Sequence, residues 1–115
     1  MGRGGEFDIA KNIRLVEWLK SEILSSVAEL YRLLAGGIKK GTKGSQDALA
    51  DCLSSMIVAA YLLGKRLGIP FPVIDNKIEN KIRLGMIEEH DVEKHYGDLT
   101  SLSEHYKARR SEERR

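Results

Sequence analysis

Two carboxylates, Glu29 and Asp51, are the side chains of this sequence whose types and surroundings point most clearly to chemistry. Asp51 is the only charged residue between Ala48 and Leu63, in a stretch that is otherwise almost wholly apolar. An ionised carboxylate buried without a partner costs on the order of several kcal/mol. We therefore predict that Asp51 is buried or half-buried, needs a cation or donors, and lies within a few ångströms of Glu29.

Two further carboxylates extend this pair. Glu22 shares a helical stripe with Glu29, and Asp47 lies one helical turn before Asp51. Clustered carboxylates repel one another unless a cation binds between them, and such hard oxygen ligands suit Mg²⁺ or Mn²⁺, which also bind phosphate oxygens. The four residues are therefore candidate metal ligands. The alternative, that Glu22 and Glu29 are ordinary solvated surface residues, stays open.

The first helix that must position these carboxylates is predicted from Asp8, a suitable N-cap, to Gly36-Gly37. Its apolar residues recur in steps of three, four or seven, as an amphipathic helix requires. They are Ile9, Ile13, Val16, Ile23, Val27, Leu30 and Leu34. Residues 1–7 are assigned to a disordered N-terminus or a tag remnant.

The second helix is the apolar segment that carries Asp51. Ser45 is its candidate N-cap, and Gly68 followed by Pro70 marks its end. Because this helix is apolar nearly all round, we expect it at the centre of the core. A basic, flexible connection at residues 39–44 joins the two helices, which should form an antiparallel hairpin.

The remaining sequence predicts shorter helices. Gly85 interrupts or ends a third helix, and helical pieces follow at residues 91–96 and 99–106, before a charged tail at 107–115. The polar face of the third helix carries Lys77, Asn80, Lys81 and Arg83. That face is either solvated or a set of donors for phosphate oxygens opposite the acidic pair. No strand pattern is seen, so the predicted fold class is all-α, with one helical domain at 8–106.

The composition limits the classes of partner. The net charge of +2, from 19 Lys plus Arg against 17 Asp plus Glu, gives no general attraction to nucleic acid or membranes. Basic residues are interleaved with acidic ones, which does not favour nucleic-acid binding. Cys52, the single cysteine, is expected to be buried, and a reducing cytoplasm is the expected setting. The apolar helix is interpreted as too short and interrupted to span a membrane.

The chain resembles the MazG-like family of all-α nucleoside triphosphate pyrophosphohydrolases, especially the short bacterial members. The resemblance covers about residues 8–106 and is strongest at IRLVEWLK (13–20), AEL (28–30), ALADCL (48–53) and LLGKRLGI (62–69). It implies a helical hairpin whose E-x-x-E and E-x-x-D motifs hold Mg²⁺ against a triphosphate. Here the motifs align with Ser26-Val-Ala-Glu29 and Ala48-Leu-Ala-Asp51, so only Glu29 and Asp51 match.

Two functions follow from the resemblance and both stay open. The first is Mg²⁺- or Mn²⁺-dependent hydrolysis of a nucleoside triphosphate to the monophosphate and pyrophosphate, with Glu29 and Asp51 as catalytic metal ligands. Lys77, Asn80 and Arg83 would then contact phosphates, and Trp18 would either stack on a base or pack in a core or interface. The second is a catalytically degenerate binding or scaffold protein with residual or no nucleotide affinity, which Ser26 and Ala48 favour.

The first helix also presents two apolar edges, and one hairpin cannot cover both. One edge contains Ile13, Val16, Ile23, Val27, Leu30 and Leu34, and the other contains Leu15, Trp18, Leu19 and Leu33. We therefore predict a homodimer that forms a four-helix bundle, or a dimer of dimers, with one acidic site per protomer near the edge of the interface. The family resemblance implies the same kind of assembly.

Overall fold

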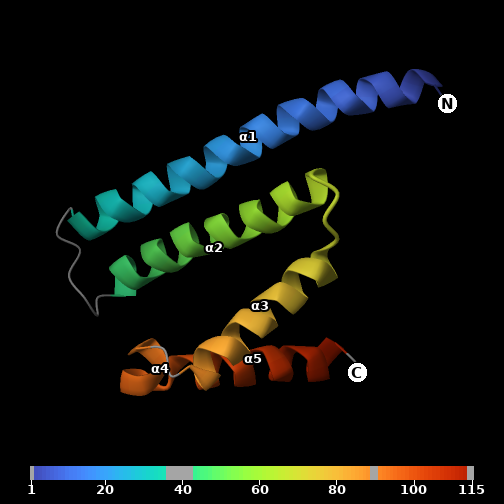
Figure 1. Ribbon diagram of the computed structural model, residues 1–115. Coiled ribbons are helices and arrows are strands. Elements are labelled where there is room, and N and C mark those ends of the chain that lie inside the picture. The colour runs from blue at the N-terminus through green and yellow to red at the C-terminus, as the bar shows by residue number, and fades with distance from the viewer. Residues whose placement is uncertain (1, 36–42, 89–90, 114–115) are drawn as a thin grey trace. The chain divides into compact units, whose positions relative to one another are not determined.

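The all-α fold class is confirmed by the computed structural model, which describes residues 2–35, 43–88 and 91–113 (Figure 1). Those residues form helices α1 (Gly2–Ala35), α2 (Lys43–Arg66), α3 (Phe71–Ile87), α4 (Asp91–Tyr96) and α5 (Asp98–Glu113), with no strand among them. The chain divides into two compact units, residues 1–71 and 72–115. The proposed boundaries at residues 8, 106 and 107 stay predictions.

Helices α1 and α2 make up the first unit and run antiparallel, side by side, which confirms the predicted hairpin (Figure 1). Helix α1 begins at Gly2, so Asp8 lies within it and does not cap its start. Helix α2 begins at Lys43, two residues before the predicted cap at Ser45. The predicted helix end at Gly36-Gly37 and most of the basic connection lie outside the described residues.

The two helices meet through a narrow, mostly small-residue seam. Leu19 of α1 and Cys52 and Ala59 of α2 are the buried apolar side chains of the described part of this unit. The Cys52 thiol donates a hydrogen bond of 3.0 Å to the Ser26 carbonyl oxygen, and Asn12 Nδ2 donates one of 2.9 Å to the Arg66 carbonyl. The second bond satisfies a carbonyl that the end of α2 would otherwise leave unpaired, so both bonds fix the register of the hairpin.

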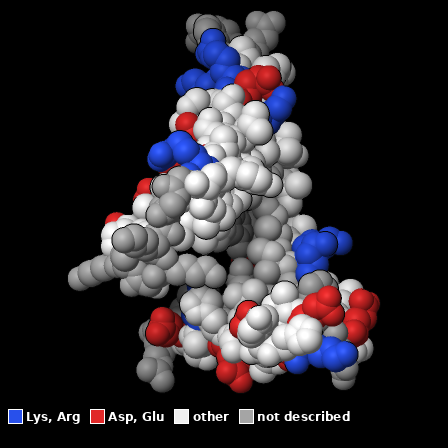
Figure 2. Space-filling view, turned by 90° about the vertical axis from the view of Figure 1, so that its left-hand side faces the viewer, with Lys and Arg blue, Asp and Glu red and all other residues white. Residues whose placement is uncertain are grey.

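The expectation that α2 lies at the centre of a core was wrong for this chain. Only 17% of the most apolar stretch of α2 is buried. Its exposed side chains include Leu53, Ile57, Val58 and Leu62. The physical reason is that α1 covers one face of α2, whereas the apolar sequence of α2 continues around the helix. On the face drawn in Figure 2, uncharged side chains occupy broad areas between the charged groups.

The length of α2 does not exclude a membrane span, contrary to the interpretation of its sequence. By length and composition alone, residues Gly44–Arg66 would be sufficient to cross a bilayer. A single helix of this kind is weak support for a membrane protein.

The predicted end of α2 is confirmed in detail. Gly68 has a φ of 88°, in the left-handed region that favours glycine. The Ile69 N–H donates to the Gly64 carbonyl at 2.8 Å, and the Gly68 N–H donates to the Lys65 carbonyl at 3.1 Å. These two bonds form a Schellman motif, which satisfies carbonyls of the last turn and ends the helix just before α3.

The second unit contains most of α3 together with α4 and α5. Gly85 lies inside α3 and neither ends nor interrupts it, because an interior glycine costs a helix only about 1 kcal/mol. Helix α5 extends beyond the predicted piece at 99–106 into the expected tail. Glu93 accepts hydrogen bonds from the Thr100 hydroxyl and the Thr100 N–H, and these bonds lower the pKa of Glu93. Glu93 of α4 thereby caps the first turn of α5.

Candidate functional site in the hairpin

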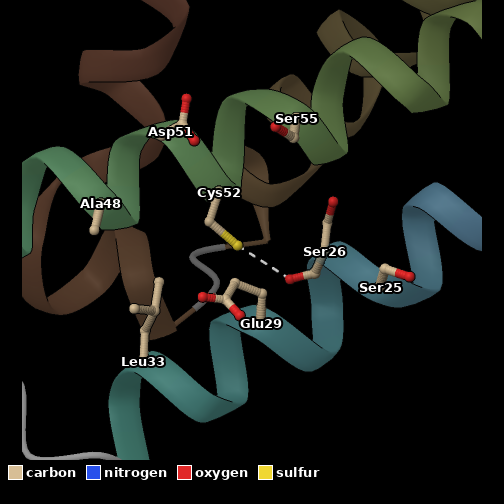
Figure 3. A pocket seen from close by; sticks show the side chains of 8 residues that line it. All are labelled: Ser25, Ser26, Glu29, Leu33, Ala48, Asp51, Cys52 and Ser55. Carbon is tan, nitrogen blue, oxygen red and sulfur yellow. Dashed lines mark hydrogen bonds between the residues drawn. The ribbon is translucent and has the colours of Figure 1, made fainter.

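A pocket of about 380 Å³ lies along the seam between α1 and α2, and it is called the seam pocket below (Figure 3). Its lining residues are Ser25, Ser26, Glu29 and Leu33 from α1, and Ala48, Asp51, Cys52 and Ser55 from α2. All four positions aligned with the two acidic motifs are among them. Residues three apart share one side of a helix, so each motif presents both of its positions to the same pocket.

Asp51 is exposed, which corrects the prediction that it is buried or half-buried. Figure 3 shows the Cys52 side chain directed from α2 toward α1, whereas the Asp51 carboxylate lies on the other side of α2. Consecutive residues of a helix are separated by about 100° around its axis, so burial of Cys52 turns Asp51 to solvent. Asp51 is therefore an exposed lining residue of the seam pocket and needs no buried partner.

Glu29 is half-buried and already has a cationic partner. Arg32 Nε donates to Glu29 Oε2 at 2.9 Å, and Arg32 Nη2 donates to Glu29 Oε1. The guanidinium therefore forms a bidentate ion pair with the carboxylate. The hydrogen bonds from Arg32, followed by its positive charge, lower the pKa of Glu29. The carboxylate thus stays ionised, but Arg32 competes with any metal ion for its oxygens.

The side chains around the seam pocket do not form a four-carboxylate metal site. Among the described residues, no group of three or more His, Cys, Asp or Glu side chains is placed to hold a metal ion. Ser26 and Ala48 offer a hydroxyl and a methyl group at motif positions, and Asp47 is exposed without lining the pocket. A cation bound here would have at most two carboxylates, and Glu29 is shared with Arg32. That donor set does not fit a tightly held Mg²⁺ ion.

Glu22, the remaining candidate ligand, lines a neighbouring groove of about 260 Å³, called the Trp18 groove below. Its lining residues are Trp18, Leu19 and Glu22 from α1, and Ser54, Ser55, Val58, Ala59 and Leu62 from α2. Ser55 lines both the groove and the seam pocket. Trp18 is 56% exposed, so its ring is accessible and not enclosed in the core of this chain.

A model of the MazG-like family matches residues 9–99. The chain belongs to the MazG-like family. The matched range includes α1 from Ile9 onward, all of α2 and the seam pocket, and it confirms the resemblance seen in the four sequence segments. Comparisons with curated proteins and with solved structures gave no match.

The phosphate-contacting residues expected in this MazG-like protein are all exposed side chains of α3: Lys77, Asn80 and Arg83. Arg83 Nη2 donates to Asn80 Oδ1 at 3.1 Å, one turn away on the same helix. The placement of these residues opposite the acidic pair stays a prediction.

Sequence reasoning missed three features of the site. Arg32 was not considered, although its spacing of three residues from Glu29 is typical of a helical ion pair. The roles of Ser55 and Cys52 as lining residues follow only from how α2 is turned about its axis. Ser55 carries no signal of its own, because nothing in the sequence distinguishes it from its neighbour Ser54.

Proposed function

We propose that this MazG-like protein is a catalytically degenerate nucleotide-binding protein, which accepts nucleotide phosphates at the seam pocket without hydrolysing them. The observation that carries the proposal is the donor set of the pocket: all four acidic motif positions line it, but Ser26 and Ala48 replace two of the four carboxylates. The hydroxyls of Ser25, Ser26 and Ser55 provide hydrogen-bonding groups at the same place. Because Glu29 and Asp51 also line the pocket and repel phosphate oxygens, a divalent cation should strengthen the residual binding.

The test is calorimetric titration with nucleoside triphosphates, with Mg²⁺ or with a chelator, beside an assay of pyrophosphate release. We expect weak binding that is stronger with Mg²⁺ or Mn²⁺ than with the chelator, and no pyrophosphate at high protein concentration. Ala48→Leu should weaken binding about tenfold or more, because it fills the pocket from α2. Ala50→Leu is the matched control, since Ala50 is exposed on the same helix outside the pocket and its substitution should leave binding unchanged. Failure of every nucleotide to bind would leave only a scaffold role.

A second candidate is the pyrophosphohydrolase activity itself, because Glu29 and Asp51 still line one pocket in a MazG-like hairpin. Glu29 and Asp51 would then be the catalytic metal ligands, and the α3 residues Lys77, Asn80 and Arg83 would contact phosphates. Pyrophosphate release that requires Mg²⁺ or Mn²⁺ and is lost in Asp51→Asn would support this candidate and reject the first one. A cytoplasmic setting, with the Cys52 thiol free, is proposed for either function.

We also propose that the protein assembles as a homodimer through an apolar flank of α1, defined by Ile13, Leu24, Tyr31 and Leu34. These side chains are between 59% and 72% exposed. They lie on the opposite flank of α1 from Trp18 and Glu29, so a second hairpin could cover them without closing the seam pocket. Such apolar exposure on a two-helix hairpin is the pattern that four-helix bundles bury by dimerisation.

Sedimentation equilibrium checks the assembly at micromolar concentration. The unchanged chain should fit a dimer, and Leu24→Lys combined with Tyr31→Lys should raise the dissociation constant about 100-fold or more, because two charges would be buried at the interface. Ser21→Lys adds a lysine to an exposed position of α1 outside this flank and serves as the control. A monomer for the unchanged chain would contradict the proposal.

A further inference from the structure

We infer that the Trp18 groove is a subsite for a nucleotide base, and that Glu22 selects bases carrying an exocyclic amino group: cytosine, adenine or guanine over uracil or thymine. The inference rests on the proposed function, because it takes the seam pocket as the place of the phosphates. It also gives Glu22 a role other than the metal ligation suggested by its sequence position.

The walls of the groove suit a flat aromatic ring. Val58, Ala59 and Leu62 of α2 form an apolar side, and Trp18 of α1 presents an accessible indole. Any of the nucleotide bases can stack on an indole face, because every base has a π face. Stacking alone would therefore accept all bases, and any preference has to come from a polar group in the groove.

Glu22 is the charged group of the groove. The Ser54 and Ser55 hydroxyls also line it, but a hydroxyl both donates and accepts and so distinguishes the bases little. Glu22 lies four residues after Trp18, on the same side of α1, and it is half-buried where it lines the groove. An ionised carboxylate only accepts hydrogen bonds. Cytosine, adenine and guanine offer amino hydrogens to it, whereas uracil and thymine place a carbonyl oxygen at the position of the cytosine amino group, which would face the carboxylate without a bond.

The Trp18 groove and the seam pocket adjoin each other, as they must if one nucleotide is to occupy both. Ser55 lines both, so no wall of α2 separates them. Along α1, Trp18 precedes Ser26 by eight residues, which a helical rise of 1.5 Å per residue converts to about 12 Å. A nucleotide extended along the seam reaches roughly this far from its base to its phosphates, so one ligand can occupy both sites.

The chain contains a single tryptophan, so Trp18 fluorescence reports directly on base stacking. We would titrate the full chain with CTP, ATP, UTP and dTTP, and with inorganic tripolyphosphate as a probe that has no base. CTP and ATP should quench Trp18 and bind about tenfold more tightly than UTP and dTTP, whereas tripolyphosphate should bind without quenching. Free N-acetyltryptophanamide corrects for light absorbed by the nucleotides.

Two variants test the roles of the side chains separately. Glu22→Gln should reduce the preference for CTP over UTP to about threefold or less, because an amide both donates and accepts. Glu17→Gln is the control, since Glu17 is an exposed residue of α1 that pairs with Lys20 outside the groove. Trp18→Leu should weaken nucleotide binding about tenfold, measured by calorimetry, and leave tripolyphosphate binding unchanged.

The outcomes separate this inference from the proposed function. Nucleotides that bind no better than tripolyphosphate, with Trp18 fluorescence unchanged, would overturn the base subsite and leave phosphate binding intact. Equal affinity for CTP and UTP in the unchanged chain would overturn the selection by Glu22. Absence of binding by every nucleotide and by tripolyphosphate would overturn the proposed function together with the inference.

Discussion

The double variant Ser26→Glu with Ala48→Glu is expected to bind Mn²⁺ about 100-fold more tightly than the unchanged chain. Both substituted positions line the seam pocket beside Glu29 and Asp51. The two added carboxylates would raise the number that line the pocket to four, and affinity for hard cations increases with the charge and number of oxygen ligands. Isothermal titration with Mn²⁺ measures the gain, and the melting temperature should rise with Mn²⁺ because the metal relieves repulsion among the carboxylates.

The matched control for this variant carries the same added charge elsewhere on the same helices. Ser21 and Gln46 are exposed and line neither the seam pocket nor the Trp18 groove, so Ser21→Glu with Gln46→Glu should leave Mn²⁺ affinity almost unchanged. Equal gains in the two variants would mean that net charge, and not the convergence of the motif positions, attracts the metal. No gain in either would contradict the assignment of the four positions to one site.

Leu19→Ala should lower the free energy of unfolding by about 2–4 kcal/mol, the cost typical of truncating a buried leucine. Leu19 is 4% exposed and is the largest buried apolar side chain of the described hairpin residues. The other buried apolar groups there, Cys52 and Ala59, are small, so neighbouring side chains have little volume with which to fill the cavity. Urea unfolding followed by helical circular dichroism measures the change.

Leu67→Ala is the control for this measurement. Leu67 is 59% exposed just after α2, so the same truncation should change the stability by less than about 1 kcal/mol. Similar losses for both variants would show that the seam between α1 and α2 does not dominate the stability of the hairpin. The packing around Cys52, including the hydrogen bond from Cys52 to Ser26, would then contribute less to the free energy of unfolding than the burial of Cys52 indicates.

Local features of this protein were predictable because they depend on residues close in sequence. The periodicity of apolar residues in α1 and the glycine at position 68 specify helices and a helix end through hydrogen bonds within a few residues. The three-residue spacing within each motif places Ser26 with Glu29, and Ala48 with Asp51, on one side of a helix. The family match over residues 9–99 agrees with these local signals.

Rotation of α2 about its own axis was decided only by the tertiary structure. The predicted burial of Cys52 is confirmed. A helix that is apolar nearly all round has no strongly preferred face, however, so its sequence did not reveal that the face with Ala59 would pack on α1 while Leu53, Ile57 and Val58 stay exposed. Close approach of the helices favours the smaller side chains at the seam, and this turns Asp51 to solvent. The same rotation makes Ser55 line both cavities. Glu22 lies beside Trp18 for a local reason, because residues four apart share one side of α1.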